Sequence, residues 1–296
     1  MINSNSYNFS KRILALAKKN KAKVGIALTE VNQDLIKHLK LSSKFAEIIV
    51  IGKKIKGFES YPLDSQEEIG AKLIELMDNK KIDAIVRGQI HPRFLFLPLF
   101  KRMNKEMSFF NGKDKVTACV FENNKTKRFF VLSTVDLWQG FDINQKNIEA
   151  MGMVNLLKEY GIEPYVGVMT MRRSKPKNSK RPKGFKPFPV IEESFAHAEK
   201  TLIFLKKRNI KAELFDIEYE TAIKAGVNII IPPIGPIGNA IARTLVFFSE
   251  QWDLVSVPSI HFRPLIIEDV FKTGSGKNFY NHIISAVASY NANKKQ

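Results

Sequence analysis

Residues 227–248 read VNIIIPPIGPIGNAIARTLVFF, and this stretch decides the fold. Its first part, 228–231, is a short apolar run rich in β-branched residues, which predicts a buried parallel strand. Prolines and glycines interrupt the run at 232–238, and apolar residues at helical spacing over 240–248 predict a helix. This order places backbone N–H groups and the positive helix end at the carboxyl edge of a sheet, where anions bind in open α/β folds. Because the loop matches neither named phosphate fingerprint, an ordinary strand-to-helix connection is an equal alternative.

The same alternation of strand and helix begins at the N-terminus. Strands are expected at 23–28, 47–51 and 84–86, and helices at 10–19, 33–39, 65–77 and 94–103. Ser65, with Glu68 three residues on, forms a capping box, and Ser10 is the expected N-cap of the first helix. The order βαβαβα predicts a parallel sheet covered by helices.

The pattern changes after this first series. Residues 116–121 and 128–134 predict an antiparallel hairpin, and Asp142 begins a long helix that closes at Gly161. A second series follows, with strands at 165–169, 212–215, 255–260 and 264–267, and helices at 192–206, 219–224 and 278–290. We therefore predict a two-domain α/β protein, with parallel sheets flanked by helices and one antiparallel hairpin.

Composition bounds the class of protein. The chain has 296 residues, of which 44% are hydrophobic, enough for two domains with ordinary cores. No apolar run reaches the length of a membrane span, and the first residues lack the apolar region of a signal peptide. Cys119 is the single cysteine, lies in the apolar run VTACVF and is expected in the core. A disulfide within the chain is therefore excluded, and a cytoplasmic location is expected.

The formal net charge of +18 favours anionic partners such as phosphorylated metabolites, nucleic acid or an acidic protein. Lysines that only solvate the surface explain the same charge without a partner. The densest basic segment is the predicted loop 171–189, in which eight residues are Lys or Arg. It fits a flap that gathers an anionic substrate, a docking site for RNA or an acidic protein, or a solvated insertion. Its aromatic residues Phe185 and Phe188 lie beyond the densest charge, so we do not expect a nucleic-acid partner.

Four predicted strand ends carry residues that resemble one enzyme family. Gly88 opens a loop to Arg93, Thr170 follows a later strand, a Pro…Gly–Asn segment at 233–240 leads into a helix, and 268–277 precedes the last helix. Their order and spacing are similar to those of the phosphotransacetylase/phosphotransbutyrylase family. The fold of that family is the one of the isocitrate/isopropylmalate dehydrogenases, and the resemblance spans nearly the whole chain.

Five segments carry a closer resemblance: IDAIVRG (82–88), VLSTVDLWQGF (131–141), YVGVM (165–169), NIIIPPIGPIGNAIARTLVFF (228–248) and IIEDVFKTGSGKNFYN (266–281). They are similar to the MtxX family, archaeal methanogenesis-marker proteins that are commonly labelled as a putative methyltransferase subunit. The resemblance implies a role in methanogenesis, as a transferase or as a subunit with protein partners. The sequence has no Gly-rich loop of the S-adenosylmethionine type with an acidic ribose partner, so no residue points directly to methyl transfer.

The resemblance also implies a layout. Residues 1–148 and 264–296 would form the first α/β domain and residues 149–263 the second. The cleft between them would bind a small anionic substrate, with coenzyme A or another phosphorylated coenzyme as the implied cofactor. Proteins of this kind are typically dimers through helices of the second domain, so a homodimer is expected.

The resemblance assigns two groups of site residues in this sequence. Those that would bind substrate are Gly88, Gln89, Arg93, Thr170, Arg172, Gly235, Gly238, Asn239, Arg243 and Lys277. Those that would orient the substrate or act near the reacting centre are His91, Thr273 and Ser275. Guanidinium groups such as that of Arg93 suit phosphate or carboxylate.

Two departures from the family bear on the reaction. The hydroxyl residues of the first loop are replaced by Pro92 and Arg93, and the Asp proposed to deprotonate the coenzyme A thiol has no counterpart. Binding of a phosphorylated or acidic ligand therefore has more support than phosphotransacetylase turnover, and a catalytically degenerate binding subunit is the alternative. No metal site is expected, because no group of residues has ligand spacing and the adjacent Glu268 and Asp269 would point apart on a strand.

Overall fold

The structure is a computed structural model that describes residues 6–102, 116–133, 139–173, 188–260, 266–269 and 275–294. The chain divides into two compact units. Unit 1 is Met1–Tyr7 with Val116–Trp252, and unit 2 is Asn8–Lys115 with Asp253–Gln296. We expected boundaries at 148/149 and 263/264. In the structure the hairpin and the start of the long helix instead group with the second series of strands and helices.

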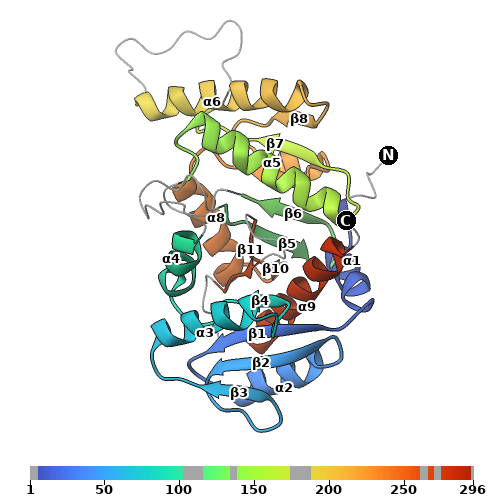
Figure 1. The fold of residues 1–296 in the computed structure, drawn as a ribbon. Helices are drawn as coiled ribbons and strands as arrows, with labels where there is room; N and C mark the ends of the chain where they lie inside the picture. The colour runs from blue at the N-terminus through green and yellow to red at the C-terminus, as the bar shows by residue number, and fades with distance from the viewer. Residues whose placement is uncertain are drawn as a thin grey trace, which may run out of the picture. The chain divides into compact units, whose positions relative to one another are not determined.

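Unit 2 is built on a sheet with the strand order β11-β12-β4-β1-β2-β3 (Figure 1). Its strands are β1 (Ala22–Leu28), β2 (Ala46–Gly52), β3 (Glu59–Pro62), β4 (Ala84–Val86), β11 (Pro258–Ser259) and β12 (Ile266–Ile267). Its helices are α1 (Phe9–Ala17), α2 (Gln33–Ser42), α3 (Gln66–Asp78), α4 (Pro92–Arg102) and α9 (Gly276–Asn293). β11 pairs antiparallel with β12, whereas β12, β4 and β1 run parallel and present their carboxyl ends at one edge.

The core of unit 2 lies between this sheet and its helices. Ile51 of β2, Leu73 of α3 and Phe96 of α4 belong to one buried apolar cluster. At Gly70 the two helices approach so closely that a Cβ would lie 2.2 Å from the carbonyl oxygen of Phe94. This close contact fixes α4 and with it the loop that precedes α4.

Unit 1 contains a second sheet with the strand order β10-β5-β6-β9-β7-β8 (Figure 1). Its strands are β5 (Cys119–Asn123), β6 (Phe129–Leu132), β7 (Tyr165–Val168), β8 (Lys211–Leu214), β9 (Ile229–Ile231) and β10 (Trp252–Ser256), and the division between the units falls within β10. Its helices are α5 (Ile143–Glu159), α6 (Pro189–Lys206), α7 (Tyr219–Lys224) and α8 (Gly235–Phe248). β6, β9, β7 and β8 run parallel, so the segments that follow β7 and β9 leave from the same edge.

The predicted fold class is confirmed in both units. The antiparallel hairpin is β5 with β6, Ser65 accepts the N–H of Glu68 at 3.1 Å as the capping box requires, and Asp142 caps α5. Cys119 is buried, as expected. Within the described ranges no helix has the length and hydropathy to cross a membrane.

Three expected elements differ from the structure. Ser10 is not the N-cap of the first helix, because α1 begins at Phe9 after Asn8 in a left-handed conformation. The helix after β9 begins at Gly235 rather than Ala240, because a proline is tolerated in the first helical turn, where N–H groups have no helical acceptor. The expected strand 255–260 is divided between β10 and β11.

Candidate functional site

The loop after β4 is held in one conformation by backbone geometry. Gly88 has a φ of +59°, and a Cβ there would lie 2.0 Å from the carbonyl oxygen of Ala27. The next amide, of Gln89, donates to that same oxygen at 3.0 Å. The loop therefore lies directly against the end of β1, and only glycine fits at its first position.

The Gln89 side chain joins this loop to the segment after β1. Its Oε1 accepts the backbone N–H of Thr29 at 2.7 Å and of Glu30 at 2.8 Å. We predicted Gln89 as a substrate-binding residue. In the structure its amide oxygen serves to hold two adjacent strand ends together.

His91 and Arg93 are exposed at the start of α4. The His91 N–H donates to Oε1 of Gln66 at 2.8 Å, and His91 Nδ1 lies 3.3 Å from the Arg93 N–H. The Arg93 guanidinium lies over the ring of Phe94, 4.5 Å from its centroid. Among the described residues, no carboxylate forms an ion pair with Arg93, so its donors face no fixed anion from that part of the chain.

A buried ion pair lies behind this loop. Arg87 is fully buried, its Nε is 3.3 Å from Oε2 of Glu268, and its Nη1 donates to the carbonyl oxygen of Ile90. The Arg87 N–H also donates to Ile267 at 2.8 Å. One side chain thus connects the loop after β4 to the residues after β12.

His282 of α9 lies beside this pair and is fully buried. Burial, with the nearby charge of Arg87, lowers the pKa of His282 to about 3. Neither ring nitrogen has a hydrogen-bond partner within the described part of the chain. His282 is therefore neutral at ordinary pH and packs in the interior of unit 2.

The residues before α9 were predicted to carry catalytic hydroxyl groups. Thr273 lies outside the described residues. Ser275 precedes α9 without a side-chain capping bond, and the Gly276 N–H instead donates to Oδ2 of Asp34 at 2.8 Å. Lys277 is paired with Asp253 at 2.9 Å. The first turn of α9 therefore already binds two carboxylates of unit 2, those of Asp34 and Asp253.

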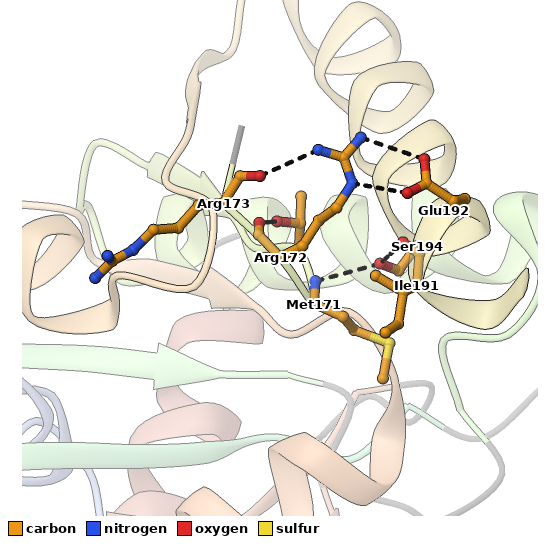
Figure 2. Close-up of polar contacts among 7 residues, drawn as sticks. Met171, Arg172, Arg173, Ile191, Glu192 and Ser194 are labelled. Carbon is orange, nitrogen blue, oxygen red and sulfur yellow. Dashed lines mark hydrogen bonds and ion pairs between the residues drawn. The ribbon is translucent and has the colours of Figure 1, made fainter. Parts of the chain in front are cut away.

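Unit 1 places Thr170 and Arg172 just after β7, and Figure 2 shows Arg172 with its partner Glu192. Thr170 is buried, and its hydroxyl donates to the carbonyl oxygen of Arg172. Arg172 forms a two-point pair with Glu192, with Nε at 3.3 Å and Nη2 at 3.4 Å, and its guanidinium lies 4.0 Å from the ring centroid of Phe195. Arg173 pairs with Glu218. Both arginines are thus engaged in anchoring the start of the basic segment, of which 174–187 lies outside the described residues.

The turn after β9 carries the remaining predicted residues. The Gly235 N–H donates to the carbonyl oxygen of Gln139 at 2.8 Å, and the Gly238 N–H donates to Ile234 at 3.2 Å. Asn239 and Arg243 lie one helical turn apart in α8, where Nε of Arg243 donates to Oδ1 of Asn239 at 3.1 Å. Arg243 is exposed, and like Arg93 it forms no ion pair with a carboxylate of the described residues.

A buried lysine lies behind this turn and was not predicted from the sequence. Lys146 of α5 is fully buried, and its Nζ donates to the carbonyl oxygen of Pro233 at 2.6 Å. Burial lowers the pKa of Lys146 to about 8, although Glu149 and Glu193 oppose the shift. The sequence did contain a sign of this buried lysine. Lys146 and Glu149 lie on the helix face of α5 that also carries Ala150, Met153 and Leu157, and such a face is normally apolar.

The lowered pKa of Lys146 predicts how stability depends on pH. The unfolded chain binds this proton more tightly, with a pKa of 10.5 against about 8 when folded. The free energy of unfolding, relative to Lys146→Met, should therefore rise between pH 8 and 10.5, by about 3 kcal/mol in total. Urea unfolding at several pH values measures this difference. The exposed Lys158→Met on the same helix is the control, and an equal pH dependence in both variants would contradict the prediction.

Solved structures are similar to this chain, whereas no protein-family profile and no curated protein matches its sequence. A branched-chain phosphotransacylase from Enterococcus faecalis V583 aligns with a TM-score of 0.66 and 12% identity, over 91% of this chain and 99% of that one. A phosphotransacetylase from Streptococcus pyogenes gives 0.64 at 12% identity, over 96% and 99%. The chain has the phosphotransacetylase fold. A putative 4-hydroxythreonine-4-phosphate dehydrogenase from Salmonella typhimurium gives 0.54 at 11% identity, over 91% and 99%.

This likeness confirms the resemblance that the strand ends suggested, at the level of the fold. The closer resemblance to the MtxX family stays a prediction, as does the association with methanogenesis. Among the described residues, no three His, Cys, Asp or Glu side chains come together as metal ligands. The predicted site residues remain candidates. Among the cationic ones, Arg172 and Lys277 form ion pairs with carboxylates, whereas Arg93 and Arg243 are exposed and form no ion pair with a carboxylate of the described residues.

Proposed function

We propose that the protein is an acyl- or phosphoryl-transferase-like protein that binds a small phosphorylated ligand, such as an acyl phosphate or coenzyme A, at its strand-end loops. The observation that carries the proposal is the contrast between its cations. Arg172 and Lys277 are bound to carboxylates, whereas Arg93 and Arg243 are exposed beside the strand-end segments, with no such partner in the described ranges. Planar guanidinium groups suit phosphate oxygens at two points.

The fold supports the same ligand class. In open parallel sheets, ligands bind beyond the carboxyl ends of the strands. Arg93 follows β4 and Arg243 follows β9, both of which run parallel to their neighbours. The three structures named above with this fold include two described as phosphotransacylase or phosphotransacetylase. His91 would orient the substrate, and Thr273 or Ser275 would act near the reacting centre.

A second candidate is a protein that binds the same ligand without turnover. The loop from Gly88 to Arg93 contains no Ser or Thr, and Pro92 begins α4 in their place. A hydroxyl-free loop retains charge for binding but has no hydroxyl to hold a transferred phosphoryl group. Under this proposal, a methyltransferase subunit or another subunit of the methanogenesis machinery would use the fold to hold a coenzyme.

Binding is tested first, by calorimetric titration with coenzyme A, acetyl-coenzyme A, acetyl phosphate, phosphate, S-adenosylmethionine and coenzyme M. We expect one of the phosphate-bearing ligands to bind, and Arg93→Ala to raise its Kd by about tenfold to a hundredfold, since a hydrogen bond to a charged group is lost. Asn239→Ala, which frees Arg243, should also change the affinity.

Arg208→Ala is a matched control, because this exposed arginine also lies over a phenylalanine ring, 3.7 Å from the centroid of Phe204. It should leave the Kd unchanged. An equal loss in both arginine variants would indicate a general effect of charge, and the absence of binding by any phosphate-bearing ligand would reject the proposal. Formation of acetyl-coenzyme A from acetyl phosphate and coenzyme A then distinguishes the transferase from the binding protein.

A further inference from the structure

The turn after β9 has few backbone N–H donors. It contains Pro232, Pro233 and Pro236, and none of these has an N–H to donate. The amide of Gly235 donates to Gln139 O and that of Gly238 to Ile234 O, so neither serves Pro233. The carbonyl oxygen of Pro233 must therefore find its donor elsewhere, because a buried carbonyl without a partner is costly.

Lys146 supplies that donor from a neighbouring helix. Its ammonium lies 2.6 Å from Pro233 O, and the whole side chain is buried. Removing a charge from water is costly, and an apolar residue of similar volume at a buried ion site is often equally or more stabilising. The bond to Pro233 offsets part of this cost, and a neutral donor would satisfy the carbonyl without burying a charge.

The charged groups around Lys146 come from two helices. Glu149, also buried, lies on α5, and Glu193 on α6 also acts on Lys146. Nε2 of His197 on α6 is 3.8 Å from Oε1 of Glu193, and burial together with the charge of Lys146 lowers the pKa of His197. The charges of Lys200 and Asp142 also act on His197.

Unit 2 has the same arrangement. There the buried cation is Arg87, which donates to the carbonyl oxygen of Ile90 in the loop that carries His91 and Arg93. In both units a buried cation donates to a carbonyl in the strand-end loop that bears the candidate residues. The two cations differ in one respect, since an arginine stays protonated at any ordinary pH and a buried lysine does not.

We propose that Lys146 is a positioning residue, whose ammonium holds the 232–238 turn in the conformation that receives the anionic ligand. Its effect on binding rests on the function proposed above, whereas its effect on the turn does not. Because the pKa of Lys146 is about 8, the hydrogen bond to Pro233 loses its charge above that value. Ligand affinity should then fall as pH rises from 7 to 9, beyond any change in the ligand itself.

Amide hydrogen exchange tests the effect on the turn without any ligand. In Lys146→Met the amides of Gly235 and Gly238 should exchange at least about tenfold faster than in the wild type, since a charge-assisted bond is lost. Lys158→Met, exposed on the same helix, should leave them unchanged. Unchanged exchange in Lys146→Met, with the fold intact by circular dichroism, would overturn the proposal.

Calorimetry with coenzyme A and acetyl phosphate tests the effect on binding. Lys146→Met should weaken the affinity at pH 7 by about tenfold or more. Lys146→Arg should keep the wild-type affinity at pH 7, and that affinity should not decrease between pH 7 and 9. Faster exchange with unchanged affinity at both pH values would overturn the role in binding. If the wild type binds neither probe, the proposed function fails, and the exchange rates alone decide whether Lys146 holds the turn.

Discussion

Arg87→Met should lower the free energy of unfolding by about 3–5 kcal/mol, because it removes the cation that pairs with the buried carboxylate of Glu268. Both side chains are almost completely inaccessible, with exposures of 1% and 0%. The variant also removes the donor to Ile90 and the charge that helps to hold the pKa of His282 down. Urea unfolding followed by circular dichroism measures the loss.

A second substitution separates the charge from the packing. Arg87→Met with Glu268→Met removes both charges and should recover most of the stability, since well-packed apolar residues often replace a buried pair at no cost. Arg208→Met is the surface control and should change stability by less than about 0.5 kcal/mol. A single variant as stable as the wild type, or a double variant no better than the single, would contradict a buried ion pair.

The same variants report on the loop. If Arg87 shapes the segment before α4, the double variant should regain stability without regaining ligand affinity. Its stability depends on burial of charge, whereas the position of Arg93 depends on the bond from Arg87 to Ile90. Recovery of both together would show that the ion pair is not needed to place the loop.

The sequence predicts the parallel strands of this protein well, for a physical reason. A strand buried on both faces is a continuous apolar run, so Ile229–Ile231 and Ala84–Val86 are recognisable from local composition. β3 was missed because its sequence ESYP is polar and it lies at the sheet edge, where none of its four residues is buried. The start of α8 was misplaced because prolines and glycines suit a turn and a first helical turn equally.

The buried charges could not be predicted in the same way. Arg87 follows an apolar strand, and its local sequence does not distinguish it from an exposed polar residue at a strand end. Its partner Glu268 lies far along the chain. Lys146 and Glu149 contradict the pattern of their own helix, which was a usable signal. Their partners still depend on how α5, α6 and the turn after β9 pack, and local pattern does not determine that.

Gly88→Ala is the second substitution that we expect to lower stability strongly. Alanine at a φ of +59° is strained, and its Cβ would lie 2.0 Å from the carbonyl oxygen of Ala27, a contact that cannot exist without movement. Because the clash is with backbone, either the end of β1 or the loop must shift. We expect a loss of stability on the order of 3 kcal/mol, with weaker binding of any ligand that Arg93 contacts.

Gly161→Ala isolates the clash from the backbone strain. Gly161 has a similar φ of +68°, and a Cβ there meets nothing within 4 Å. Gly161→Ala should lower the free energy of unfolding only by the strain of a left-handed backbone at alanine, about 1 kcal/mol. The difference between the two variants in urea unfolding therefore measures the close approach of the loop to β1. Equal losses would mean that the loop moves freely, and a loop that moves freely could not place Arg93 for an anion.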